Sequence, residues 1–456
     1  MNQHTNNTTS HTNSTTSTPN TTNTSNSYAG QGRDNRDGFR PPIKRFADRF
    51  ISPEANAEAK FMANADFFDN LKPKMLALAK TIREAVSNRR RIFIRHHADC
   101  DGFCAGIGLE RAIIPLIESV NDKKQAAWEK YKRMPSVTPF YNLEDVTKDI
   151  AQFLSLEQKF GEQMPLVLLV DLGSGPENIL PIKQLQIYGC EVAIIDHHPI
   201  DPTVDSLVGH HINPLHFKTE CEYSAGILCA ELSKMINPEV EGEELLAAIS
   251  CVGDRVEEDR AAPYFAMVSK EGYDKELLLK VAKSIDFTAH NLRGVEGREL
   301  MDTLLGGDKH KQLATIDLLS TELAVREKRI IAQAMPIIKI ENTSKISYAL
   351  FPVSDLTLRD MYPRLGNIVG MMSDYIITNK KAQKPLVMLG TTPNSITFRA
   401  QDETPFDFPT LLKHLQETMP LAFVEGGGHP HAGTLRCAET KFDEVMKSTI
   451  AYLHTL

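Results

Sequence analysis

Two uninterrupted apolar runs, each followed by an acidic residue, constrain the fold of this chain more than any other sequence feature. Leu166–Val170 precedes Asp171, and residues 192–195 precede Asp196. Strands that are exposed on one face alternate apolar and polar residues, whereas strands covered on both faces are continuously apolar. Both runs therefore predict buried parallel strands, and residues 176–188 between them provide a crossover helix.

A further strand is predicted upstream, over residues 91–95. It leads into a glycine-containing turn at 99–102 and an apolar helix at about 105–118. Residues 71–86 repeat apolar side chains at helical spacing, which predicts an amphipathic helix before this strand. Strands that alternate with helices indicate a doubly wound α/β sheet.

The pattern changes after Pro336. A mainly helical block from about 223 to 335 gives way to predicted strands at 346–353, 386–391 and 395–400 and predicted helices at 365–378 and 408–417. This pattern predicts a second, smaller α/β domain. We expect four segments, namely a disordered tail and linker over 1–45, a catalytic domain over 52–320, a connecting helix and linker over 321–340, and a substrate-binding domain over 341–456.

The disordered tail is predicted from composition, because 22 of the first 29 residues are Thr, Asn or Ser. Such a segment cannot bury enough apolar surface to offset the entropy lost on ordering. The N-terminus lacks the charged-then-apolar pattern of a signal peptide, and the sequence has no apolar run long enough to cross a membrane. Seven scattered cysteines without a CxxC pair fit reduced thiols, so we expect a cytoplasmic protein.

Acidic residues follow each predicted strand of the larger domain. Asp99 and Asp101 follow the first, Asp171 the second, and Asp196 the third. In open α/β sheets ligands bind outside the carboxyl ends of the strands, so these segments should meet in one cleft. Crowded carboxylates need cations, and carboxylate and imidazole ligands suit Mn²⁺, Mg²⁺ or Zn²⁺. A single Asp after a strand is more often a helix cap, but several in succession favour a metal site.

The motifs resemble those of the DHH phosphoesterase superfamily. The matching segments span residues 90–435, and within the superfamily the spacing resembles the archaeal RecJ-like nucleases with a C-terminal DHH-associated domain. The five matching motifs, in order, are His97-x-Asp99-x-Asp101-Gly102, Asp171, Asp196-His197-His198, Gly253-Asp254 and Gly426-Gly427-Gly428-His429.

This resemblance implies roles for individual residues. It implies two divalent cations, Mn²⁺ with Mg²⁺ as the alternative, with Asp171 bridging both and His198 beside the phosphate. Asp196 would orient an imidazole. The implied metal ligands are Asp99, Asp101, Asp171, His197, Asp254 and His97. The implied substrate-binding residues are Arg399, Gly426, Gly427, Gly428, His429 and His431.

Two of these assignments have alternatives. Some family members ligate through a histidine four residues before the first aspartate of the motif, and here that position is Arg95, so His96 or His97 would have to substitute. His431 either contacts the scissile phosphate or only stabilises its loop.

The resemblance implies an exonuclease that cuts single-stranded DNA or RNA with water activated by two metals. Replication or repair proteins would be its partners. The net charge of −8 does not favour nucleic-acid binding, but metal in an acidic site attracts phosphate locally. The alternatives are a phosphodiesterase for short oligonucleotides or cyclic dinucleotides, and a replisome or repair scaffold related to RecJ. The retained ligands favour an enzyme over a scaffold.

Overall fold

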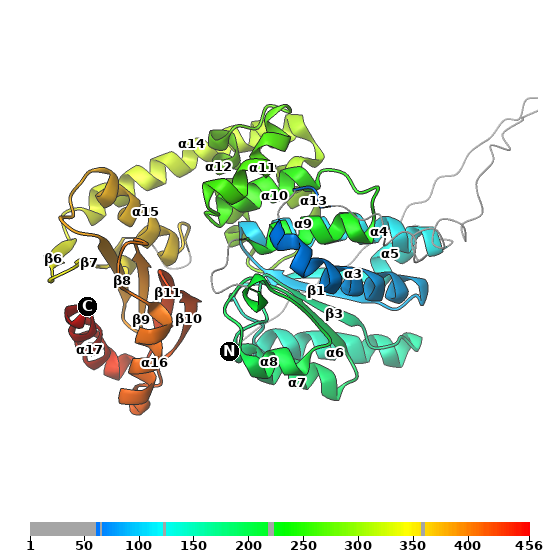
Figure 1. Cartoon of the computed structure of the whole chain (residues 1–456), viewed down its shortest axis with the longest axis horizontal. Helices are drawn as coiled ribbons and strands as arrows, with labels where there is room; N and C mark the ends of the chain where they lie inside the picture. The colour runs from blue at the N-terminus through cyan, green and yellow to red at the C-terminus, as the bar shows by residue number, and fades with distance from the viewer. Residues whose placement is uncertain (1–60, 64–65, 122–124, 218–222, 357–360) are drawn as a thin grey trace, which may run out of the picture. The chain divides into compact units, whose positions relative to one another are not determined.

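The computed structural model describes all residues except 1–60, 64–65, 122–124, 218–222 and 357–360. The expected tail and linker at 1–45 therefore lie outside the described residues. The described part contains two sheets, each covered by helices (Figure 1).

The first sheet has five parallel strands in the order β2-β1-β3-β4-β5. Its strands are β1 Ile92–His97, β2 Tyr131–Ser136, β3 Leu166–Val170, β4 Glu191–Ile195 and β5 His210–Ile212. The chain order reverses between β1 and β3, and in such sheets a ligand site forms where the order reverses. The site is therefore expected at the carboxyl ends of these two central strands.

Helices cover both faces of this sheet, so the predicted doubly wound fold is confirmed. Along β1, Ile92 and Ile94 belong to one core and Phe93 to the other, as the two-residue period of a strand requires. One face carries α3 Asp66–Ser87, α4 Cys100–Val120, α9 Ala225–Ile236 and α10 Glu243–Gly253. The other carries α6 Leu143–Phe160 and α7 Ile179–Ile187.

Shorter elements and a helical block complete this part of the chain. The short elements are α5 Gln125–Lys130, η1 Pro176–Asn178, α8 Pro202–Leu207 and η2 Pro214–His216. The helical block continues with α11 Glu258–Ser269, α12 Lys275–Leu292, α13 Arg298–Asp302, η3 Thr303–Gly307 and α14 Lys309–Ala334. Helix α14 packs against both α12 and α15, so it links the block to the second sheet.

The second sheet has six strands in the order β10-β11-β9-β8-β7-β6. Only β7 and β8 pair in parallel. The strands are β6 Lys339–Asn342, β7 Ser347–Pro352, β8 Leu386–Thr392, β9 Ser395–Ala400, β10 Glu425–His429 and β11 Ala432–Arg436. The helices are η4 Val353–Asp355, α15 Leu365–Thr378, α16 Phe408–Thr418, η5 Pro420–Ala422, η6 Glu439–Lys441 and α17 Phe442–Thr455.

Three local features differ from the expected pattern or add to it. The glycine-rich signature Gly426–His429 lies in strand β10, which pairs along its length with β11. The segment expected to connect the two domains from residue 321 belongs to a helix that begins at Lys309. The stretch before α6 contributes edge strand β2, which was not predicted. The division of the chain into domains stays a prediction.

Within the described part of the chain, we find no helix that combines the length and the apolar character needed to span a membrane.

Candidate metal centre

Asp171 occupies a constrained position at the end of β3. Its backbone is left-handed, with φ of 54°, a conformation that Asp and Asn adopt more readily than most residues. Its amide donates a hydrogen bond of 2.9 Å to the Ile195 carbonyl of the neighbouring strand. The carboxylate is buried, and its Oδ2 has no hydrogen-bond partner among the described residues. A buried, unsatisfied carboxylate oxygen is costly, so this position calls for a cation.

Asp99 and Asp101 lie at the start of α4, directly after β1. Asp99 caps the helix, because its Oδ1 accepts the Gly102 amide at 2.9 Å. Asp101 is buried, and its two oxygens accept the Ala225 and Gly226 amides at 2.9 and 2.8 Å. These amides lie at the amino end of α9, where a carboxylate is electrostatically favoured. Both carboxylates are therefore held in place by backbone amides.

His97, Asp99 and Asp171 form the first group of candidate ligands. His97 Nδ1 lies 2.7 Å from Asp99 Oδ2 and 3.6 Å from Asp171 Oδ2. Burial by itself lowers the pKa of His97, but the two carboxylates outweigh it and raise the pKa to about 10. Without a metal, the imidazolium of His97 would therefore balance part of the negative charge.

Asp101, His197 and Asp254 form the second group. His197 Nε2 lies 3.4 Å from Asp254 Oδ2 and 3.9 Å from Asp101 Oδ2. The same nitrogen lies 3.2 Å from Asp171 Oδ1. Burial, followed by the charges of Asp171 and Asp254, raises the pKa of Asp101 well above its ordinary value. The crowding of three carboxylates around one imidazole is the arrangement that a divalent cation relieves.

The two groups have the donor chemistry and spacing for two cations. In each group, the three ligand atoms lie within 4.8 Å of one another. Asp171 lies between the groups, with Oδ2 toward His97 and Oδ1 toward His197. Carboxylate and imidazole donors suit Mn²⁺, Mg²⁺ or Zn²⁺.

Asp196 follows β4 and holds His198 in place. Its Oδ1 lies 2.7 Å from His198 Nδ1 and accepts the His197 amide at 2.8 Å, while Oδ2 accepts the Ser174 amide at 2.9 Å. Burial alone would lower the pKa of His198, but Asp196 raises it. Asp196 is thus a positioning residue for His198, and its own oxygens are already occupied.

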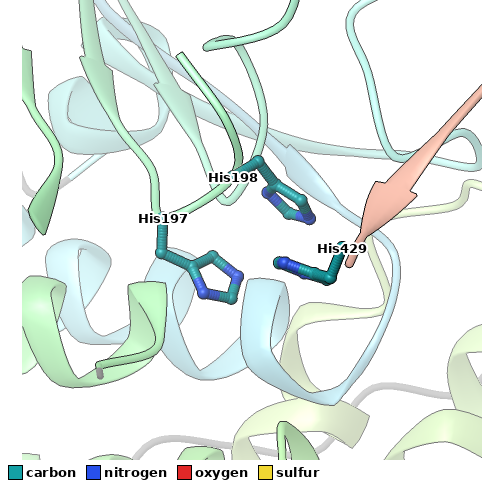
Figure 2. A group of neighbouring side chains, drawn as sticks. All are labelled: His197, His198 and His429. Atoms are coloured by element: carbon teal, nitrogen blue, oxygen red, sulfur yellow. The ribbon is translucent and has the colours of Figure 1, made fainter. Parts of the chain in front are cut away.

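His429, at the end of β10, lies beside His197 and His198, which follow β4 (Figure 2). Its ring centroid lies 4.9 Å from that of His198, in a stacked arrangement, and 5.4 Å from that of His197. Burial and these two imidazoles keep the pKa of His429 well below its ordinary value. A neutral ring at this position can donate a hydrogen bond from one nitrogen and accept one at the other.

The three glycines of β10 differ in the space around them. An added Cβ on Gly426 or Gly428 would collide with the backbone of β11, and Gly428 also has φ of 150°. An added Cβ on Gly427 would meet only Glu177 Oε1, at 4.0 Å. Gly426 and Gly428 are therefore required by strand packing, while Gly427 lies beside open space.

Two other expected substrate residues belong to the second sheet, Arg399 in β9 and His431 in the turn between β10 and β11. Arg399, in β9, is a partly exposed cation whose pKa is lowered, first by desolvation and then by Arg255, while Asp254 opposes the shift. It therefore places a positive charge near the second ligand group. His431 is absent from every cluster of candidate ligands found among the described residues. Its backbone oxygen accepts the Ala400 amide at 2.8 Å, which is a contact within the sheet.

The structure distinguishes between His96 and His97, the two histidines that could take the place of the ligand missing at Arg95. Arg95 forms a buried ion pair with Asp149, at 2.5 Å. His96 is buried, with its Nε2 2.9 Å from Arg133 Nη1. Only His97 of the three contacts the carboxylates of the site. The strand period places Arg95 and His97 on one face of β1, but only His97 reaches the carboxyl end.

Two residues that support the site, Asp286 and Arg364, were not predicted from the sequence. Asp286 Oδ1 accepts the Cys100 amide at 2.9 Å, and burial together with Asp99 raises the pKa of Asp286 to about 7. Arg364 Nη2 donates to the Ala98 carbonyl at 3.0 Å and so ties the β1–α4 turn to the start of α15. Neither residue belongs to a recognisable motif, because each acts through a backbone group of the turn.

Comparison with known proteins places this geometry in context. No protein-family model matches the sequence. An uncharacterized protein of Methanocaldococcus jannaschii is 34% identical over 442 residues, which cover 91% of this chain and 58% of that protein. The chain thus spans less than two thirds of this curated relative.

Solved structures give similar results. The DHH domain of a member of the s1p family of ribosomal proteins is 33% identical, with a TM-score of 0.85 over 91% of this chain and 98% of the other. RecJ of Thermus thermophilus, in complex with Mn²⁺, has 17% identity and a TM-score of 0.59 over 84% of this chain and 55% of that one. An exonuclease RecJ bound to manganese has 17% identity and a TM-score of 0.55 over 83% and 94%.

Proposed function

Because this chain belongs to the DHH phosphoesterase superfamily, we propose that it is a two-metal phosphodiesterase that removes nucleotides from the ends of single-stranded DNA or RNA. One observation carries the proposal. Each carboxylate oxygen of Asp171 faces a different group of candidate ligands, and Oδ2 is buried without a hydrogen-bond partner among the described residues. A bridging carboxylate between two cations is the arrangement that metal-assisted phosphoryl displacement uses.

His97, Asp99 and Asp171 would hold one cation, and Asp101, Asp171, His197 and Asp254 the other. When bound, such cations neutralise phosphate charge and lower the pKa of water toward neutrality. RecJ of Thermus thermophilus has been solved in complex with Mn²⁺ and with Mg²⁺, which supports a divalent cation here. We propose Mn²⁺ as the metal, with Mg²⁺ as the alternative.

The remaining residues would bind and orient the phosphodiester. Asp196 fixes the ring of His198 so that its Nε2 is available to a phosphate oxygen. His429, stacked on His198, would donate a second hydrogen bond, and Arg399 adds a positive charge near Asp254. Gly427 would leave space for the substrate backbone, which a side chain at this position would obstruct.

Digestion of end-labelled substrates tests this proposal. Single-stranded DNA and RNA, duplex DNA, a dinucleotide and a cyclic dinucleotide are incubated with the full chain in Mn²⁺, in Mg²⁺ and in EDTA. We expect stepwise shortening of single strands in either metal and none in EDTA. Cleavage of only the dinucleotide or cyclic dinucleotide would instead support a small-substrate phosphodiesterase, and full activity in EDTA after removal of bound ions would refute the two-metal mechanism.

Two variants distinguish catalysis by this site from contamination. Asp171→Asn should abolish cleavage of every substrate. Asp443→Asn makes the same chemical change on the exposed face of α17 and should retain it. Single-strand binding without cleavage by the wild type would favour a scaffold, for which replication or repair proteins of the cytoplasm are the partners we would propose.

A further inference from the structure

A second cluster of metal-binding side chains lies at the edge of the first sheet. Asp205 on α8, His211 on β5 and His216 on η2 place their ligand atoms within 4.8 Å of one another. Asp205 Oδ1 lies 3.0 Å from His211 Nδ1 and 2.8 Å from His216 Nε2. The two imidazoles contact each other edge to face, with centroids 4.8 Å apart. None of these residues belongs to the centre described above.

In each ring, the nitrogen that does not face Asp205 already has a hydrogen-bond partner. His216 Nδ1 lies 3.1 Å from the Asn213 carbonyl, which can only accept, so this nitrogen carries a proton. His211 Nε2 lies 2.9 Å from Ser174 Oγ. Metal-bound histidines in proteins almost always show this arrangement, in which a second partner fixes the tautomer and the ring.

If the His216 ring is neutral, its other nitrogen, Nε2, therefore carries no proton. Its Nε2 lone pair would face Asp205 Oδ1 at 2.8 Å, and two acceptors repel at that distance. A cation between them removes the conflict. The alternative is an imidazolium that pairs with Asp205 and needs no metal.

The geometry of the cluster suits a small tetrahedral ion. Ligand atoms around Zn²⁺ at bond lengths of about 2.0–2.1 Å lie about 3.3 Å apart. The distances here are 2.8 and 3.0 Å, so a few tenths of an ångström of opening suffices, and Asp205 is exposed enough to move. All three ligands lie within 12 residues of one another in sequence, so little chain entropy is lost in bringing them together.

We propose that Asp205, His211 and His216 bind a zinc ion, separate from the two cations of the phosphodiesterase centre. Two imidazoles and one carboxylate favour Zn²⁺ over Mg²⁺, which prefers oxygen ligands, and water would complete the coordination. The ion clamps α8, β5 and η2 together.

This clamp is connected to the phosphodiesterase centre by hydrogen bonds. Ser174 Oγ, next to His211, accepts Asn213 Nδ2 at 3.0 Å, and the same amide donates to the His198 carbonyl at 2.9 Å. The Ser174 amide donates to Asp196. The zinc ion would therefore stabilise the segment that carries His198 without contacting the substrate.

The test is a comparison of zinc binding in full-length variants. The background is Asp171→Asn, which weakens binding at the first centre, and the protein is stripped with chelator before titration with Zn²⁺ alone. We expect one tight Zn²⁺ per chain, at least tenfold weaker binding when His216→Ala or Asp205→Asn is added, and tetrahedral Co²⁺ absorption bands that disappear with the same changes.

His210→Ala is the matched control, because its ring lies on the same short strand but contacts Thr81 Oγ1, at 2.9 Å. It should retain the tight zinc and the cobalt bands. An unchanged zinc affinity in both His216→Ala and Asp205→Asn would overturn the proposal, and so would an equal loss in His210→Ala. Neither measurement uses nuclease activity, so the proposed function and the zinc site can fail independently.

Discussion

Asp171→Asn and the wild type should exchange their order of stability when metal binds. Asn has nearly the shape of Asp and also tolerates the left-handed backbone found at this position. The substitution therefore removes one charge and little else. Without metal, the variant should be more stable than the wild type, because it lacks one of the crowded carboxylates. With metal, it should be less stable.

The magnitude follows from the distances in the two groups. Ligand oxygens of Asp99 and Asp171 lie within 4.8 Å, where two like charges repel by about 3 kcal/mol at an effective dielectric constant of 20. His97 and His197 offset part of this repulsion, so we expect a gain of about 1–2 kcal/mol in the metal-free state. In the wild type, Mn²⁺ at 100 times its dissociation constant would add about 2.7 kcal/mol.

The assay is thermal unfolding of both proteins in EDTA and across a Mn²⁺ titration, with cleavage measured on the same preparations. The two stability curves should cross as Mn²⁺ increases. Residual cleavage above about a tenth of the wild-type rate, a barrier change of only about 1.4 kcal/mol, would contradict a bridging carboxylate. Equal stabilisation of both proteins by Mn²⁺ would also refute the reasoning, and Asp443→Asn should behave like the wild type.

Three further predictions follow from individual contacts. Burial raises the pKa of Glu243 to about 8, so stability present at low pH should be lost as pH rises from about 4.5 to 8. Glu243→Gln should remove this pH dependence and exceed the wild type by roughly 3 kcal/mol at pH 7, measured by denaturant unfolding at several pH values. Gly427→Val should fold normally yet bind single-stranded oligonucleotide at least tenfold more weakly, whereas Gly428→Val should lower the melting temperature; unchanged affinity for Gly427→Val would exclude it from the substrate path. Arg95→Met should destabilise the fold by about 3–5 kcal/mol because it leaves the Asp149 carboxylate buried without its partner, while Mn²⁺ affinity per folded molecule stays constant, as titration on the folded fraction would show.

Local sequence patterns were sufficient to predict the bounds of several central strands and helices. Strands β3 and β9 and helix α15 have the bounds expected from their residues, because a continuous apolar run or a helical period is a property of neighbouring residues. Edge strands behave differently. β2 is largely polar, β5 has only three residues, and β10 is largely glycine, so each is a strand only because a partner strand supplies its hydrogen bonds.

The candidate metal centre, too, could be predicted only in part from the sequence. The sequence by itself marked Asp99, Asp171 and Asp196, because acidic turns after buried strands must meet at one edge of a parallel sheet. His197 was assigned only through the family resemblance. Only the tertiary structure decided that His97 contacts the carboxylates while Arg95 pairs with Asp149. That choice depends on which partners helices distant in sequence bring to each side of the strand. For the same reason, only the folded chain could place Asp171 between two ligand groups.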